Sequence, residues 1–260
     1  MQDKSTLEDT LLLMRDLRAR CEWDAAQTHE SLRPYLIEEA YEVDDAIRSG
    51  DDTKLREELG DLLLQILFHS VLAEERGGFT MEDVATAFVT KMKGRHPHLY
   101  GEGAKQPWEQ MKAKKRDSLV DGLPVDLPAL HRAFRLQDRA AGVGFDWPDV
   151  AGPSEKVEEE LEEVRVELRG HPPAPAGSPP NYGPEYERLE EEIGDLLFAV
   201  VNLSRKAGVH PSIALDKANV KFARRFGAVE RMAAERGWKP GDATLEQLDS
   251  LWDSVKESER

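Results

Sequence analysis

The sequence predicts an all-α fold that is built from two copies of one helical unit. Apolar residues recur at the helical spacing of three and four along 36–47 and again along 59–67. Alternating apolar and polar residues, the pattern of β-strands, are absent. Residues 57–68 read EELGDLLLQILF and residues 191–202 read EEIGDLLFAVVN, with six identical positions. We therefore expect a tandem duplication with four or five helices in each copy.

Other features recur in the same order and define the two copies. The segment IEEAYEV at 37–43 matches EEELEEV at 158–164. The further matched pairs are Lys91 and Arg95 with Lys221 and Arg225, and Trp108 and Lys112 with Trp252 and Lys256. We expect the first copy at 1–116 and the second at 128–260, joined by a linker at 117–127 that contains Pro and Gly.

Glycines and prolines mark the expected ends of the helices. Gly50, Gly77 and Gly170 lie where the helical pattern stops, as glycines at helix C-termini do. The second copy has 28 residues between Glu163 and Glu192, where the first copy has 15 between the equivalent residues. Six of the fifteen residues at 170–184 are prolines, which predicts an extended loop between two helices.

Composition excludes several classes of protein. The 260 residues include 35 Lys and Arg against 51 Asp and Glu, a formal net charge of −16. Nucleic-acid-binding proteins normally carry a basic surface, and anionic membranes attract basic segments, so neither partner is expected. Cys21 is the one cysteine, which fits a reducing compartment. The first ten residues, MQDKSTLEDT, lack the apolar stretch of a secretory signal, so we expect a cytoplasmic protein.

Acidic residues form a spaced pattern on two consecutive helices of each copy. The first helix carries Glu-Glu-x-x-Glu, and the next long helix begins with Glu-x-x-Asp. Residues three and four positions apart are neighbours on a helix surface, so two antiparallel helices could point these carboxylates at one place. Gathered carboxylates repel one another unless a cation lies among them, and an all-oxygen ligand set suits Mg²⁺ or Mn²⁺ rather than zinc.

An alternative is that the acidic residues of the first helix form a solvated face, since they lie roughly opposite its apolar residues. The second helix argues against this alternative. Apolar residues cover most of its circumference at 61–72, and such a helix is expected to be buried. Glu58, Asp61 and Gln65 would then lie in packed surroundings, where carboxylates are costly unless they are paired or bind a metal.

With these residues the sequence resembles the MazG family of nucleoside triphosphate pyrophosphohydrolases in its two-copy form. The family pattern is EExxE followed by ExxD, and both copies contain it. The flanking segments that also resemble the family are CEWDAAQTHESL (21–32), RHPHLYG (95–101), GFDWPDV (144–150) and KANVKFARRF (217–226). The resemblance covers nearly the whole chain. Glu22 departs from the Pro that is common in relatives, and Arg188 from a common Lys.

The resemblance implies an all-α fold, a homodimer formed by helix packing, and Mg²⁺-dependent hydrolysis of (d)NTPs to the monophosphate and pyrophosphate. Mn²⁺ is an alternative metal. The implied metal ligands are Glu160, Glu163, Glu192 and Asp195 in the second copy and Glu39, Glu42, Glu58 and Asp61 in the first. In two-copy relatives the C-terminal copy is usually regarded as the catalytic one, whereas here both copies retain every carboxylate.

The remaining acidic residue of each pattern is a candidate general base. Glu159 in the second copy, or Glu38 in the first, could orient or deprotonate the attacking water.

Basic and aromatic residues of both copies are candidates for binding the nucleotide. Those of the second copy are Arg188, Lys221, Arg225, Trp252 and Lys256, and those of the first are Lys91 and Arg95. Lys221 and Arg225 lie one helical turn apart and could bind phosphate oxygens, although solvated side chains on an exposed helix are the alternative. Trp252 could stack on any base, which fits broad base specificity, or it could simply pack in the core.

Two other functions are compatible with the same sequence. One is a catalytically silent nucleotide-binding or regulatory protein with the same fold, against which the two complete motifs argue. The other is a structural helical adaptor, in which the acidic residues would have no role in metal binding.

Overall fold

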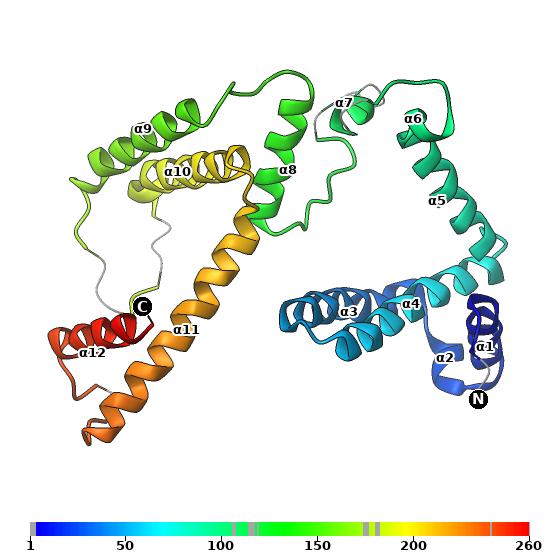
Figure 1. Ribbon diagram of the computed structural model, residues 1–260, viewed down its shortest axis with the longest axis horizontal. Helices are drawn as coiled ribbons and strands as arrows, with labels where there is room; N and C mark the ends of the chain where they lie inside the picture. Colours follow the sequence, from blue (N-terminus) through cyan, green and yellow to red (C-terminus); the bar gives the residue numbers. More distant parts are fainter. Residues whose placement is uncertain are drawn as a thin grey trace. The chain divides into compact units, whose positions relative to one another are not determined.

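The computed structural model describes residues 4–105, 108–113, 118, 120–173, 177–179, 183–239 and 241–259. The chain divides into two compact units, Met1–Lys105 and Gln106–Arg260. All regular elements in these described ranges are helices, which confirms the all-α fold predicted from the sequence (Figure 1). None of the described helices combines the length and the apolar character that a membrane span needs.

The first unit is organised around a helical hairpin. Its helices are α1 (Leu7–Arg20), α2 (Glu22–Ala26), α3 (His29–Ser49), α4 (Asp52–Glu75), α5 (Met81–Arg95) and α6 (Pro97–Tyr100). α3 and α4 pack side by side, and α1 packs on α4 (Figure 1). Gly50 ends α3 with a φ of 69°, a left-handed conformation that glycine adopts without strain. The chain can therefore reverse direction within two residues, and Asp51 then caps the start of α4.

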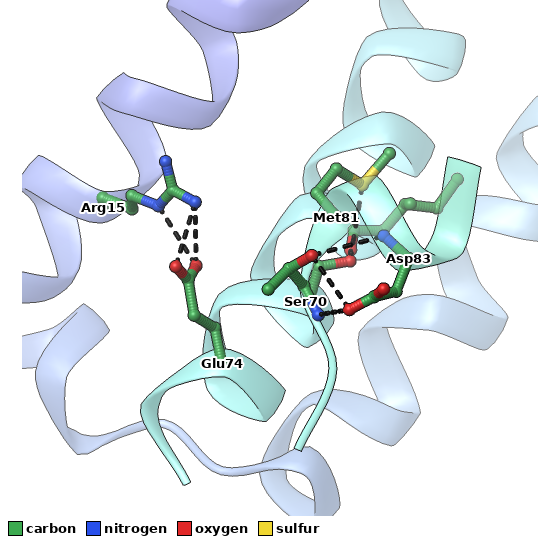
Figure 2. Close-up of polar contacts among 7 residues, drawn as sticks. Arg15, Ser70, Glu74, Met81 and Asp83 are labelled. Carbon is green, nitrogen blue, oxygen red and sulfur yellow. Dashed lines mark hydrogen bonds and ion pairs between the residues drawn. The ribbon is translucent and has the colours of Figure 1, made fainter. Parts of the chain in front are cut away.

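The core of the first unit lies where α1, α3 and α4 meet. Its buried residues are Leu11, Met14, Leu32, Leu67, Phe68, Val71 and Leu72. Polar contacts fix the neighbouring helices around this core. Arg15 of α1 donates from Nη2 to Glu74 Oε2 of α4 at 2.9 Å, and Ser70 lies beside Met81 at the start of α5 (Figure 2).

The second unit repeats the hairpin arrangement. Its elements are α7 (Trp108–Ala113), α8 (Ala129–Gly142), α9 (Ala151–Leu168), the 3-10 helix η1 (Pro184–Tyr186), α10 (Glu187–Lys206), α11 (Pro211–Glu235) and α12 (Leu245–Ser258). α9 packs along α10, α8 packs on α10, and α12 packs on α11 (Figure 1). Asp146, in the segment before α9, pairs with Arg205 and with Lys206 Nζ at 3.0 Å, which fixes this segment to the end of α10.

The helix α7 packs with the second unit, although the sequence pattern placed its residues in the first copy. Glu109 of α7 accepts a hydrogen bond from Arg135 of α8 at 2.9 Å. A Cβ at Gly142 of α8 would lie 2.8 Å from Glu109 Cβ, so the two helices approach closely because this residue is glycine. The expected copy boundary at 116, and positions 117 and 119 of the linker expected at 117–127, lie outside the described residues.

The expected burial of the helix at 61–72 is wrong for part of its circumference. Leu67 and Phe68 are buried in the core, whereas Leu64 and Ile66 are 37% and 42% exposed. The physical reason is that α1 and α3 cover only part of α4 within one chain. Uncovered apolar residues remain on α3 and α4, and the equivalent surface of α9 and α10 shows the same feature.

His171 joins the two ends of the proline-rich loop expected at 170–184, of which 174–176 and 180–182 lie outside the described residues. Its Nδ1 lies 2.8 Å from the Glu167 carbonyl oxygen, and its Nε2 lies 2.7 Å from the Glu185 carbonyl oxygen. Carbonyl oxygens only accept hydrogen bonds, and both ring nitrogens can donate only in the charged imidazole, so this arrangement favours the charged form. These bonds, first to Glu167 and then to Glu185, raise the pKa of His171 above its ordinary value of 6.5.

We predict that His171 stabilises the protein in a pH-dependent way. A pKa that is raised in the folded state adds stability below the ordinary value of 6.5, and this stability is lost as the pH rises through the raised pKa. The melting temperature of His171→Gln should therefore fall below that of the parent at about pH 5.5 and approach it at about pH 9. His98→Gln, which removes an exposed histidine of the first unit, is the control. An equal difference at both pH values would contradict the prediction.

Candidate active site

The hairpin of α9 and α10 brings three carboxylates together in the second unit. Glu160 and Glu163 from α9 and Glu192 from α10 each offer one oxygen, and these three oxygens lie within 4.8 Å of one another. We call this group the C-terminal carboxylate cluster. Glu160 is only 4% exposed, whereas Glu163 faces solvent. The i, i+3 spacing on α9 places two of the ligands on one face, and packing against α10 supplies the third.

An equivalent group forms on the hairpin of α3 and α4 in the first unit. Glu39 from α3 and Glu58 and Asp61 from α4 place one oxygen each within 4.8 Å of the others. We call this group the N-terminal carboxylate cluster. The structure thus gathers six of the eight carboxylates predicted as metal ligands. Glu42 and Asp195, the remaining two, belong to neither group of three.

The residues of both clusters fit a divalent cation. Glu160 Oε2 is buried and has no hydrogen-bond partner, and a buried carboxylate oxygen without a partner is costly unless a cation binds it. Partial desolvation by the neighbouring protein, and then repulsion from Glu160 and Glu192, raise the pKa of Glu163. Burial, and then repulsion from Asp61 and Glu42, raise the pKa of Glu39. Oxygen ligands of this kind suit a hard cation such as Mg²⁺ or Mn²⁺.

A lysine that the sequence analysis did not single out lies at the C-terminal carboxylate cluster. Lys156 Nζ is 2.5 Å from Glu160 Oε1 and 2.8 Å from Glu159 Oε1. Hydrogen bonds to Glu159 and Glu160 raise the pKa of Lys156, so its ammonium group stays charged. Its spacing of i, i+3 and i, i+4 from these two residues was the available signal.

The candidate general bases differ in their surroundings. Glu159 is bound to Lys156, while Glu38 is exposed on α3.

The nucleotide-binding candidates of the second copy lie in two places. Arg188 lies in the first turn of α10 and pairs with Glu167 of α9 at 2.9 Å. Arg225 lies on α11, pairs with Glu259 at 2.7 Å, and places its guanidinium carbon 5.9 Å from the ring centroid of Trp252.

The residues on α11 and α12 form one group that is separate from the C-terminal carboxylate cluster. Lys256 pairs with Asp253 at 2.7 Å, and Lys221 is exposed on α11. α12 packs chiefly on α11, and α11 runs away from the end of α10 (Figure 1). In the first unit Lys91 is exposed and Arg95 is half-buried, both on α5.

Comparison with known proteins identifies the family. A family model described as the MazG nucleotide pyrophosphohydrolase domain matches residues 27–100. The nucleoside triphosphate pyrophosphohydrolase/pyrophosphatase MazG of Thermotoga maritima is 43% identical over 258 residues, covering 96% of this chain and 95% of that protein. The nucleoside triphosphate pyrophosphohydrolase of Escherichia coli K12 is 42% identical, covering 95% of this chain and 94% of that protein.

The chain belongs to the MazG family. The matched segment 27–100 contains the whole N-terminal carboxylate cluster. The two long alignments extend the MazG relationship over both units. The nucleoside triphosphate pyrophosphohydrolase of Mycobacterium tuberculosis is 41% identical over 170 residues, or 62% of this chain and 50% of that protein. The resemblance read from the acidic motifs is therefore confirmed.

We predict that divalent cations stabilise this MazG protein. A cation bound among the repelling carboxylates of the folded state, and not in the unfolded chain, adds about 2.7 kcal/mol at a hundredfold excess over its dissociation constant. Mg²⁺ or Mn²⁺ should raise the melting temperature by about 4 °C or more. The control is NaCl at equal ionic strength, because screening of the −16 net charge alone would stabilise the chain. Equal effects of the two salts would contradict the prediction.

Proposed function

We propose that this chain is a Mg²⁺-dependent nucleoside triphosphate pyrophosphohydrolase, which cleaves (d)NTPs to the monophosphate and pyrophosphate. The observation that carries the proposal is the convergence of Glu160, Glu163 and Glu192 around an unsatisfied buried oxygen. A triphosphate and an acidic site repel each other, so a cation must lie between them. A divalent cation held there would neutralise phosphate charge and polarise the phosphorus that is attacked.

The side chains around the cluster supply the other roles. Glu159 adjoins the cluster on α9 and is the general base of the proposal, because it can accept a proton from water once Lys156 leaves it. Asp195 follows Glu192 by one turn on α10, so a rotamer change would let it join the cluster as a fourth ligand. Arg188 lies one turn before Glu192 and is placed to contact a phosphate.

The group on α11 and α12 is the proposed binding surface for the rest of the nucleotide. Trp252 is half-buried, and Phe222 lies 5.4 Å from it between ring centroids. An aromatic face stacks on any base, worth roughly 1–3 kcal/mol per base, and this supports broad base specificity. Lys221, Arg225 and Lys256 would bind phosphate oxygens after exchanging their present partners or solvent.

The second unit is proposed as the catalytic one. Its α11 is 25 residues long and packs with α12, whereas α5 of the first unit has 15 residues, none of them buried. The sequence counterpart of α12 is α7, and α7 packs on α8 of the second unit. Within the described residues, the first unit therefore keeps its carboxylates but not its own copy of the helix that carries Trp252 and Lys256 in the second.

A homodimer and a cytoplasmic location complete the proposal. Exposed apolar residues line both helical hairpins, including Ile66 on α4 at 42% and Val200 on α10 at 44%. An apolar face of this kind is typical of an interface between subunits. A free cysteine, Cys21, fits the reducing cytoplasm.

We predict that the two clusters contribute unequally to turnover. Glu192→Gln should lower pyrophosphate release from NTPs with Mg²⁺ by about a hundredfold or more, because transition-state charge stabilisation by a metal is worth several kcal/mol. Glu58→Gln, the matched change in the first unit, should retain most of the activity. Pyrophosphate and monophosphate are measured over a panel of NTPs, and the helical circular dichroism signal serves as the folding control.

The same assay separates the proposed enzyme from the alternatives. Nucleotide binding without turnover by the parent protein would favour a catalytically silent regulatory protein. No binding of either metal or nucleotide would favour a structural adaptor. A loss of activity in Glu58→Gln alone would move the catalytic role to the first unit.

We predict that a charge on the apolar face of either hairpin weakens the dimer. Ile66 and Val200 occupy equivalent positions in the two copies, about two turns beyond Glu58 of α4 and Glu192 of α10. Burying a charge without a partner is costly, so Ile66→Glu and Val200→Glu should each shift the mass measured by light scattering from dimer toward monomer. Leu7→Glu, at a position that is 73% exposed on α1, is the control and should leave the mass unchanged.

A further inference from the structure

The two carboxylate clusters differ in one respect that the acidic motifs do not reveal. In the C-terminal carboxylate cluster the ammonium group of Lys156 lies 2.5 Å from Glu160 Oε1. In the N-terminal carboxylate cluster no lysine or arginine of the described residues is ion-paired with Glu39, Glu58 or Asp61. A positive charge therefore directly contacts a ligand oxygen in the C-terminal cluster, and no such ion pair occurs among the described residues of the N-terminal one.

The difference arises from a single position in the repeat. Glu39 and Glu160 are equivalent, so the residue four positions before Glu39 is the counterpart of Lys156, and it is Tyr35. Tyr35 is uncharged and lies edge-on to Trp23, with ring centroids 6.3 Å apart. The lysine nearest to the N-terminal cluster in sequence is Lys54 on α4, and its Nζ is ion-paired with Asp45 at 2.7 Å, which is not a member of the cluster. Lys54 also interacts electrostatically with Glu58 of the cluster, but it contacts none of the cluster's ligand oxygens as an ion pair.

Lys156 uses a ligand oxygen that a metal ion would need. Glu160 is 4% exposed, and its second oxygen is the buried one without a partner. A divalent cation that binds both oxygens, or the one that Lys156 contacts, must displace the ammonium group or share the carboxylate with it. Lys156 also contacts Glu159 Oε1 at 2.8 Å, so a single ammonium group is shared between a ligand carboxylate and the proposed general base.

We infer that Lys156 is an internal competitor for the divalent cation at the C-terminal carboxylate cluster, so that this cluster binds metal more weakly than the N-terminal one without nucleotide. The inference rests on the metal site of the proposed function. A positive charge beside a ligand oxygen opposes a divalent cation even when it is not displaced, because like charges at about 4 Å interact strongly near a protein surface. The two clusters would then bind metal at different concentrations of the free divalent cation.

Titration of the full chain with Mn²⁺ in the absence of nucleotide tests the inference, with free Mn²⁺ measured by electron paramagnetic resonance. Glu58→Gln disables the N-terminal cluster, so the Mn²⁺ binding that remains is that of the C-terminal cluster. Glu192→Gln disables the C-terminal cluster, so the binding that remains is that of the N-terminal one. We expect about tenfold weaker binding to the C-terminal cluster. Adding Lys156→Met to Glu58→Gln should tighten binding by about tenfold, and adding Tyr35→Lys to Glu192→Gln should weaken it by a similar factor.

Two controls separate competition from a general effect of net charge. Lys156→Arg keeps a positive charge beside Glu160, so the C-terminal cluster should still bind Mn²⁺ weakly. Arg165→Met removes a charge from the same helix, where Arg165 pairs with Glu162 at 3.3 Å, outside the cluster, and should change Mn²⁺ affinity far less than Lys156→Met does. Circular dichroism confirms that each variant is folded.

The outcomes distinguish this inference from the proposed function. If both clusters bind Mn²⁺ and Lys156→Met leaves the affinity unchanged or weakens it, competition by Lys156 is overturned while the metal sites stand. If neither the parent nor Lys156→Met binds Mn²⁺, the metal site and the inference are overturned together.

Discussion

Repulsion between carboxylates that helix packing forces together is the constraint on which the site depends. The hairpins of α3 with α4 and of α9 with α10 each bring three acidic side chains within 4.8 Å. Apolar packing along the hairpins opposes this repulsion, and a bound cation would remove it. The balance between packing and repulsion is clearest at Glu160. This carboxylate is buried, one of its oxygens is paired with Lys156, and the other has no partner.

The two copies share this constraint but have diverged around it. The first unit retains its carboxylates and has a short α5 without buried residues. The second unit has a long α11 that packs with α12 and places Arg225 beside Trp252. At one pair of equivalent positions the second unit has Lys156, whose charge contacts Glu160, and the first unit has the uncharged Tyr35. Duplication therefore gave two similar acidic sites, and later changes in a few neighbouring residues and one helix made them chemically different.

The hairpin helices have two faces with different roles. One face of α4 carries Glu58 and Asp61, while Leu64 and Ile66 remain exposed elsewhere on the same helix. A helix that is apolar over most of its circumference needs partners on several sides, and one chain supplies only some of them. The sites and the apolar faces thus depend on the same pair of helices, so a partner that packed on the hairpin would also stiffen the carboxylate cluster.

The helical class, the hairpins and the acidic motifs were determined by the sequence alone, because helical period and i, i+3 or i, i+4 spacing are local properties. Tertiary structure alone decided which carboxylates meet, leaving Glu42 and Asp195 outside the groups of three. It also decided that Lys156 contacts Glu160 and that α7 packs on α8. These outcomes depend on side-chain rotamers and on contacts between distant segments, which no spacing along one helix specifies.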